Sequence, residues 1–183
     1  VSYCLYGSKR HMMKELFNKE ERPFYRFGDL LMLDRIDGSY WIDYIVKSFA
    51  GSGKSINNSL ASSIATIAEN HPYYVQQLSH MVWIHSKSEV DEDDLEYAIR
   101  HLLETNAIFY QEIVDQLSNT QLEMINAAID NVSQFSSAET MRRYKLGTPN
   151  NISKNKVALE NKDIIEFGGE IPRFVDPFFK LWY

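Results

Sequence analysis

The chain has 183 residues, 44% of them hydrophobic, and a formal net charge of −6 at pH 7. This length has room for one large domain or two small ones with a hydrophobic core, and the negative charge argues against a general coat for nucleic acid. A single cysteine, Cys4, excludes an internal disulfide framework and a cysteine-rich zinc site. The sequence shows neither a secretory leader nor an apolar stretch of roughly 20 residues, so we expect a cytoplasmic protein that contacts no membrane.

The first 37 residues contain two short apolar runs with the composition of buried strands. Val1–Tyr6 is aromatic and β-branched, and residues 30–36 form the second run. Between them, Ser8 is suited to cap a short helix over residues 9–17. We therefore predict one or two strands here, although such strands need neighbours that this chain barely supplies.

Residues 38–118 change to the three- and four-residue apolar spacing of amphipathic helices. Pro72 suits the first turn of one helix, and Asp91 is a good N-cap for a long one, because the acidic residues after it favour the helix dipole. The spacing predicts helices over residues 41–49, 60–68, 72–83 and 91–117. The apolar stripe of the long helix comprises Leu95, Ile99, Leu102, Phe109, Ile113 and Leu117.

The last part of the chain begins at the capping sequence Ser118-Asn119-Thr120. Its patterns predict three helices and a β-hairpin with a Gly168-Gly169 turn. The predicted helices and strands cover residues 122–129, 137–144, 152–161, 164–167 and 171–175. Three helices followed by a hairpin is the order of a winged helix. We therefore predict a mainly α fold with domains at residues 1–37, 38–118 and 119–183.

The segment Gly51-Ser52-Gly53-Lys54-Ser55 resembles the end of a phosphate-binding P-loop, Gly-x-x-x-x-Gly-Lys-Ser/Thr. That loop needs a buried strand before it and a helix after it, so that amide groups face the phosphate. Here the first glycine position is Ser48, and the preceding residues have the spacing of an amphipathic helix. We therefore predict a helix-terminal loop with a solvated lysine, where carbonyl groups rather than amides would face an anion.

Several stretches give the chain a resemblance to the C-terminal portion of a prokaryotic AAA+/STAND-type ATPase of the archaeal-ATPase-like family. Residues 3–13 are similar to the late core strand and turn of that family, and residues 23–26 with residues 31–36 to its last core strand leading into the lid. Asn70-His71-Pro72-Tyr73 lies where the family usually has a Gly-x-Pro-type turn that opens a lid helix. The family's closing signature is similar to Ile164–Phe167 together with Asp176–Trp182. The resemblance implies the end of an α/β core, a helical lid and a winged helix.

The resemblance also implies where functional residues lie. Ser8 corresponds to the polar sensor 1 residue that hydrogen-bonds the γ-phosphate or the attacking water, although a plain helix cap is an equally simple interpretation. His71 and Pro72 would lie near the nucleotide. The P-loop and Walker B carboxylates would belong to a core upstream of Val1, and that core would bind ATP and Mg²⁺. This chain alone would then not be an enzyme, and we identify no catalytic residue and no metal-ligand pattern in it.

The predicted winged helix has a local charge opposite to that of the chain. Residues 137–162 contain six basic and two acidic residues, a local net charge of +4. This asymmetry is typical of a recognition helix that meets DNA phosphates, although the hairpin adds only Arg173. The candidate DNA contacts are Arg142, Arg143, Lys145, Lys154 and Lys156.

Three functions stay open at this point. The first is a regulatory lid and winged helix that couples the nucleotide state of an ATPase to a partner, with the winged helix as an internal brake. The second is a sequence-specific DNA-binding module whose helical part dimerises it. The third is a protein-interaction domain that uses aromatic residues such as Phe178, Phe179 and Trp182.

Overall fold

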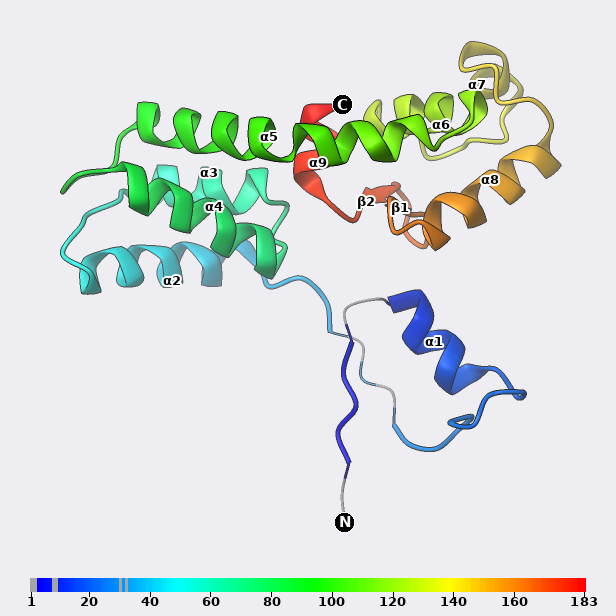
Figure 1. Ribbon diagram of the computed structural model, residues 1–183, viewed down its shortest axis with the longest axis horizontal. Helices are drawn as coiled ribbons and strands as arrows, with labels where there is room; N and C mark the ends of the chain where they lie inside the picture. The colour runs from blue at the N-terminus through cyan, green and yellow to red at the C-terminus, as the bar shows by residue number, and fades with distance from the viewer. Residues whose placement is uncertain (1–2, 8–9, 30, 32) are drawn as a thin grey trace. The chain divides into compact units, whose positions relative to one another are not determined.

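The computed structural model describes residues 3–7, 10–29, 31 and 33–183, and over these residues the chain is mainly helical (Figure 1). Contacts group the chain into two compact units. Asp34–Leu122 with Asp176–Tyr183 form one, here called the four-helix unit. Glu123–Val175, here called the helix–hairpin unit, belong to the other together with the residues up to Leu33. In the described residues no helix combines the length and apolarity that crossing a bilayer requires.

The described N-terminal residues form a helix, α1 (Arg10–Asn18), but no strand in either run where the sequence predicts one or two. Residues 3–7, 31 and 33–36 are irregular, and Tyr3 and Leu31 are 77% and 80% exposed. A strand belongs to a sheet, and the sheet found among the described residues is the hairpin of β1 and β2 near the C-terminus. The strand prediction is therefore wrong for these residues. Val1, Ser2, Leu30 and Met32 lie outside the described residues.

The four-helix unit consists of α2 (Gly38–Gly51), α3 (Asn58–Ile67), α4 (Pro72–His85) and α5 (Glu92–Asp115), with the short α9 (Pro177–Trp182) packed on α5. Figure 1 shows α2, α4 and α5 side by side. Asp37 and Asn57 cap α2 and α3, and Asp91 caps α5 in a reciprocal capping box. All four predicted helices are thus confirmed. Their buried apolar faces include Ile45, Phe49, Ile64, Val75, Leu78, Val82 and Leu102.

The apolar stripe of α5 differs from the predicted one near its end. Phe109 is 57% exposed, whereas Tyr110 is 2% exposed. These residues are seven and eight positions after Leu102, so both lie close to its face of a helix with 3.6 residues per turn. The packing of α9 decides between them, because Phe179 and Trp182 contact the Tyr110 ring.

The helix–hairpin unit has the predicted order of three helices and a hairpin. The elements are α6 (Asn119–Ile129, whose first turns belong to the four-helix unit), α7 (Ala138–Arg143), α8 (Pro149–Asn161), β1 (Ile165–Glu166) and β2 (Arg173–Phe174). Helix α8 begins three residues earlier than predicted, because Thr148 caps it and Pro149 suits its first turn. The antiparallel strands pair only Ile165 with Phe174 and Glu166 with Arg173, so the hairpin loop is longer than predicted. The core includes Phe135, Leu146, Ile152, Leu159, Ile165 and Phe174.

Candidate functional site

The closing helix α9 is organised by one carboxylate, that of Asp176. Its Oδ1 accepts hydrogen bonds from the amides of Phe178 and Phe179 at 2.8 and 3.2 Å, which caps the helix. Its Oδ2 accepts from the Tyr110 hydroxyl at 3.0 Å. The negative charge of the same carboxylate also raises the pKa of Tyr74, whose ring packs on Phe178 of α9. Asp176 therefore links α9 to both α4 and α5.

Tyr74 and Tyr110, the two tyrosines near Asp176, are both held in their neutral form. Burial raises the pKa of Tyr74 and of Tyr110 above the ordinary value of 10.0, and the negative charge of Asp176 raises both further. Both hydroxyls therefore keep their protons throughout the physiological pH range. The aromatic rings around them strengthen the arrangement, since Tyr74 packs edge-to-face on Phe178 with 5.7 Å between ring centroids.

The turn between α3 and α4 contains two consecutive residues with left-handed backbone, Glu69 at φ 47° and Asn70 at φ 58°. Such residues persist only where the surrounding structure holds them. Arg35 donates to the Glu69 carbonyl at 2.6 Å and to its carboxylate at 2.8 Å. Lys180 of α9 donates to the other carboxylate oxygen at 3.4 Å, and the Trp41 indole donates to the Asn70 carbonyl at 3.3 Å. Three separate segments thus fix this turn, here called the 68–71 turn.

The residues that the resemblance places near a nucleotide lie at the end of this turn. His71 is the N-cap residue of α4, and Pro72 is in its first turn. The side-chain oxygen of Asn70 is buried and has no hydrogen-bond partner among the described residues. A left-handed conformation favours glycine, and asparagine tolerates it better than most residues. This explains why Asn70 can occupy a position where the resembling family commonly has glycine. Ser8 lies outside the described residues.

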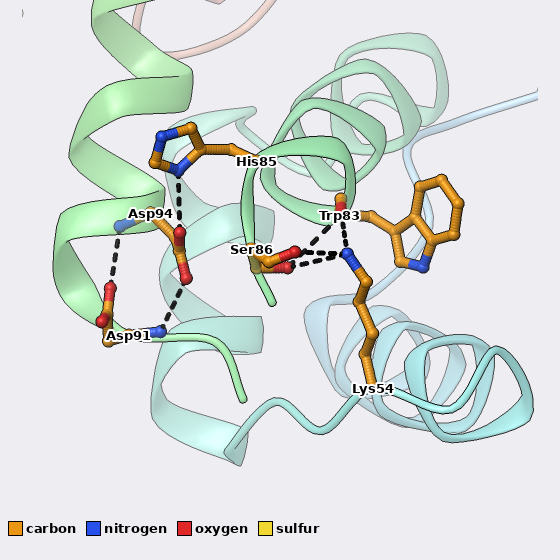
Figure 2. A network of polar contacts seen from close by, with 6 residues as sticks. All are labelled: Lys54, Trp83, His85, Ser86, Asp91 and Asp94. Atoms are coloured by element: carbon orange, nitrogen blue, oxygen red, sulfur yellow. Dashed lines mark hydrogen bonds and ion pairs between the residues drawn. The ribbon is translucent and has the colours of Figure 1, made fainter. Parts of the chain in front are cut away.

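The P-loop-like segment lies at the end of helix α2, and its lysine binds the C-terminal end of α4, as Figure 2 shows. The Lys54 amine donates to the carbonyls of Trp83 and Ser86 and lies 4.7 Å from the centroid of the Trp83 ring. A lysine in this position satisfies terminal carbonyls of a helix and complements its dipole. The predicted helix-terminal loop is confirmed. The prediction of a solvated lysine is wrong, because Lys54 is half-buried and bound to carbonyl oxygens.

The start of α5 lies beside this loop and completes the same network in Figure 2. Asp94 is 8% exposed; it accepts from the Asp91 amide at 3.2 Å and lies 2.8 Å from Nδ1 of His85. The His85 ring stacks on Tyr97 at 3.8 Å between centroids. Every polar group in this network serves a helix end or the loop between two helices. The P-loop-like segment therefore has a structural role here and offers no phosphate cradle.

Two of the five side chains predicted to contact DNA interact with other residues of the helix–hairpin unit. Lys156 is half-buried, and its amine lies 4.8 Å from the centroid of Phe135 and 5.0 Å from that of Phe167. This is a cation–π arrangement with two rings, which stabilises the unit. Arg143 forms an ion pair with Asp130 at 3.5 Å. Lys156 would have to leave its two rings to reach a phosphate, whereas the Arg143 side chain is 67% exposed and forms only a surface ion pair.

The other three predicted contacts are exposed. Arg142 lies at the end of α7, Lys145 follows it with φ 53°, and Lys154 lies on α8. No ion pair or side-chain hydrogen bond of these three is recorded within the described part of the chain. Of the predicted set, Lys156 alone is half-buried, and the other four cations, Arg143 included, are exposed.

Sequence patterns missed the partners of Asp176 and Glu69. The pair Asp176-Pro177 is a signal for a helix start, an N-cap followed by proline in the first turn, and it would have located α9. No local signal marks Tyr110 or Glu69, because their partners lie 66 and up to 111 residues away in the sequence.

A family model described as a probable winged helix domain matches residues 108–183. No curated protein and no solved structure gives a significant match to the chain. The C-terminal part of the chain is therefore a winged-helix domain, which agrees with the order of α6, α7, α8 and the hairpin. The match also includes α9 and the end of α5. It is a match to the winged helix alone, so the ATPase resemblance stays a prediction.

Proposed function

We propose that this chain is the lid and winged-helix portion of an AAA+/STAND-type ATPase and couples its nucleotide state to a partner. The observation that carries the proposal is the strained 68–71 turn. It lies directly before His71-Pro72, where the resemblance places the nucleotide, and it has a glycine-like backbone at Asn70. Strained non-glycine residues cluster at ligand sites and switches, because the surrounding structure must be built to hold them.

The order of the elements supports the same proposal. The four-helix unit is followed in the chain by the helix–hairpin unit. The last helix, α9, then belongs to the four-helix unit again. In this arrangement the four-helix unit serves as the lid, with the N-terminal end of α4 toward the nucleotide. In this proposal ATP and Mg²⁺ are bound by a core upstream of this chain. The P-loop-like lysine of the chain itself, Lys54, instead binds carbonyl groups at the end of α4.

The test uses the full-length polypeptide that contains this chain. We expect it to hydrolyse ATP, and His71→Ala to weaken nucleotide binding by roughly threefold to thirtyfold through lost contact and a loosened turn. His80→Ala is the matched control, because this exposed histidine lies on the same helix away from the turn. Nucleotide affinity is measured by titration calorimetry. No hydrolysis by the full-length protein, or turnover by the 183-residue chain alone, would reject the proposal.

A second candidate function, DNA binding by α8, is favoured by the exposed cations Arg142, Lys145 and Lys154. If they contact phosphates, Lys154→Gln should weaken binding to duplex DNA and reduce the slope of log K against log[salt] by about 1. Lys156→Gln is the matched control on the same helix. Because its amine is held between Phe135 and Phe167, it should leave the salt slope unchanged.

Binding is measured by fluorescence anisotropy of the 183-residue chain at several salt concentrations. Equal effects of the two substitutions would show that the rings do not withhold Lys156 from DNA. Absence of salt-dependent binding by the unsubstituted chain would exclude this second function and leave the regulatory one.

A further inference from the structure

We propose that α9 couples the helix–hairpin unit to the 68–71 turn of the four-helix unit, and we call this helix the latch. A change in the folding or binding state of the helix–hairpin unit would then change the stability of the turn. The regulatory meaning of this coupling rests on the proposed function, because that function places the nucleotide at the turn. The coupling itself is a property of this chain and needs no nucleotide.

The connection between the hairpin and the latch is very short. Strand β2 ends at Phe174 and α9 begins at Pro177, so only Val175 and Asp176 lie between them. Both residues are fixed. The Val175 amide donates to the Ile164 carbonyl at 3.0 Å, and Asp176 caps α9. Proline in the first turn of α9 further restricts the backbone. Opening of the hairpin would therefore change the chain immediately before the cap of α9.

The latch reaches the 68–71 turn by two routes. Along one, Asp176 and Phe178 contact Tyr74, and the Tyr74 ring packs edge-to-face on His71 at 4.8 Å between centroids. Along the other, Lys180 pairs with the carboxylate of Glu69. Both routes end on residues whose backbone is at or beside the strained positions. Loss of the latch therefore removes support from a conformation that depends on it.

The experiment measures amide hydrogen exchange in the 183-residue chain. The reporters are the amides of Glu69, Asn70 and His71, which donate to carbonyls of α3 and of the turn itself. The perturbation is Ile165→Val, a conservative truncation of a fully buried hairpin residue that pairs with Phe174 of β2. It should raise opening of the helix–hairpin unit by roughly twofold to twelvefold. If the latch couples the units, exchange at the three reporters should rise by a comparable factor.

The decisive comparison repeats Ile165→Val in a background that carries Tyr74→Phe and Lys180→Gln. These changes remove the polar contacts of the latch with α4 and the turn and keep its apolar packing. In this background we expect Ile165→Val to change reporter exchange by less than about twofold, since coupling is the non-additive part of a mutant cycle. A purely structural latch would give additive effects, with the same acceleration in both backgrounds, and this result would overturn the proposal.

Two internal controls keep the experiment interpretable. The Val175 amide must exchange faster in every Ile165→Val variant, and the amides of Ser55 and Val90, at the other end of the four-helix unit, should stay unchanged. The Trp41 indole resonance is a second readout of the turn through its bond to Asn70. If the doubly substituted background fails to fold, Lys180→Gln alone provides the comparison. Unchanged reporters after Ile165→Val in the unsubstituted background would also overturn the coupling, whatever the full-length protein does with ATP.

Discussion

Replacement of Phe135 by alanine is expected to destabilise the helix–hairpin unit by about 3–5 kcal/mol, the usual cost of removing a buried phenylalanine ring. Phe135 is 1% exposed and packs edge-to-face on Phe167 with 5.4 Å between ring centroids. Its ring also faces the Lys156 amine, which would lose one of its two aromatic partners. Urea unfolding, followed by exchange of amides in α8, measures the loss in this unit.

The control for this prediction is Val157→Ala on α8. Val157 is 54% exposed, so its truncation should change the free energy of unfolding by less than about 0.5 kcal/mol. A loss below about 1 kcal/mol for Phe135→Ala would show that the ring is not the centre of this core. The consequence for function is direct, because the position of α8 against Phe135 decides which cations are available to a ligand.

Much of the helical part of this fold could be predicted from local patterns. The capping residues Asp91 and Ser137 locate the starts of α5 and α7. A cap can be recognised from sequence because its side chain binds an amide only three residues further on. The spacing of apolar residues predicts the four helices between residues 38 and 117, because this signal too lies within a short stretch of sequence. The two N-terminal runs failed because their composition suits a strand, whereas a strand also needs a partner that composition cannot supply.

The roles of individual cations could not be predicted locally. Lys54 and Lys156 both look like solvated lysines in the sequence. One binds carbonyls about 30 residues away at the end of α4, and the other lies between two rings from separate loops. Each depends on tertiary packing, so the charge pattern alone overestimates the set of cations free to bind phosphate. The charge of the α7–α8 region was nevertheless a useful guide, since Arg142 and Lys154 are exposed.

Replacement of Asp176 by alanine should destabilise the four-helix unit by about 3 kcal/mol. The helix cap contributes about 1 kcal/mol. The hydroxyl of Tyr110 would also lose its acceptor, and a buried donor without a partner costs about 1–3 kcal/mol. Urea unfolding of the 183-residue chain at pH 7 measures the total. Because Tyr110 is 2% exposed, water cannot readily replace the lost carboxylate there.

The matched substitution is Asp176→Asn, which keeps an oxygen acceptor and a good capping residue while it removes the charge. We expect it to cost less than half as much as Asp176→Ala. Equal losses would show that the negative charge, rather than the number of acceptors, holds α9 in place. Asp176→Asn should also lower the pKa of Tyr110, although burial, the larger cause, will keep it above the ordinary value. Ultraviolet titration of the tyrosines distinguishes these two origins of the stability of α9.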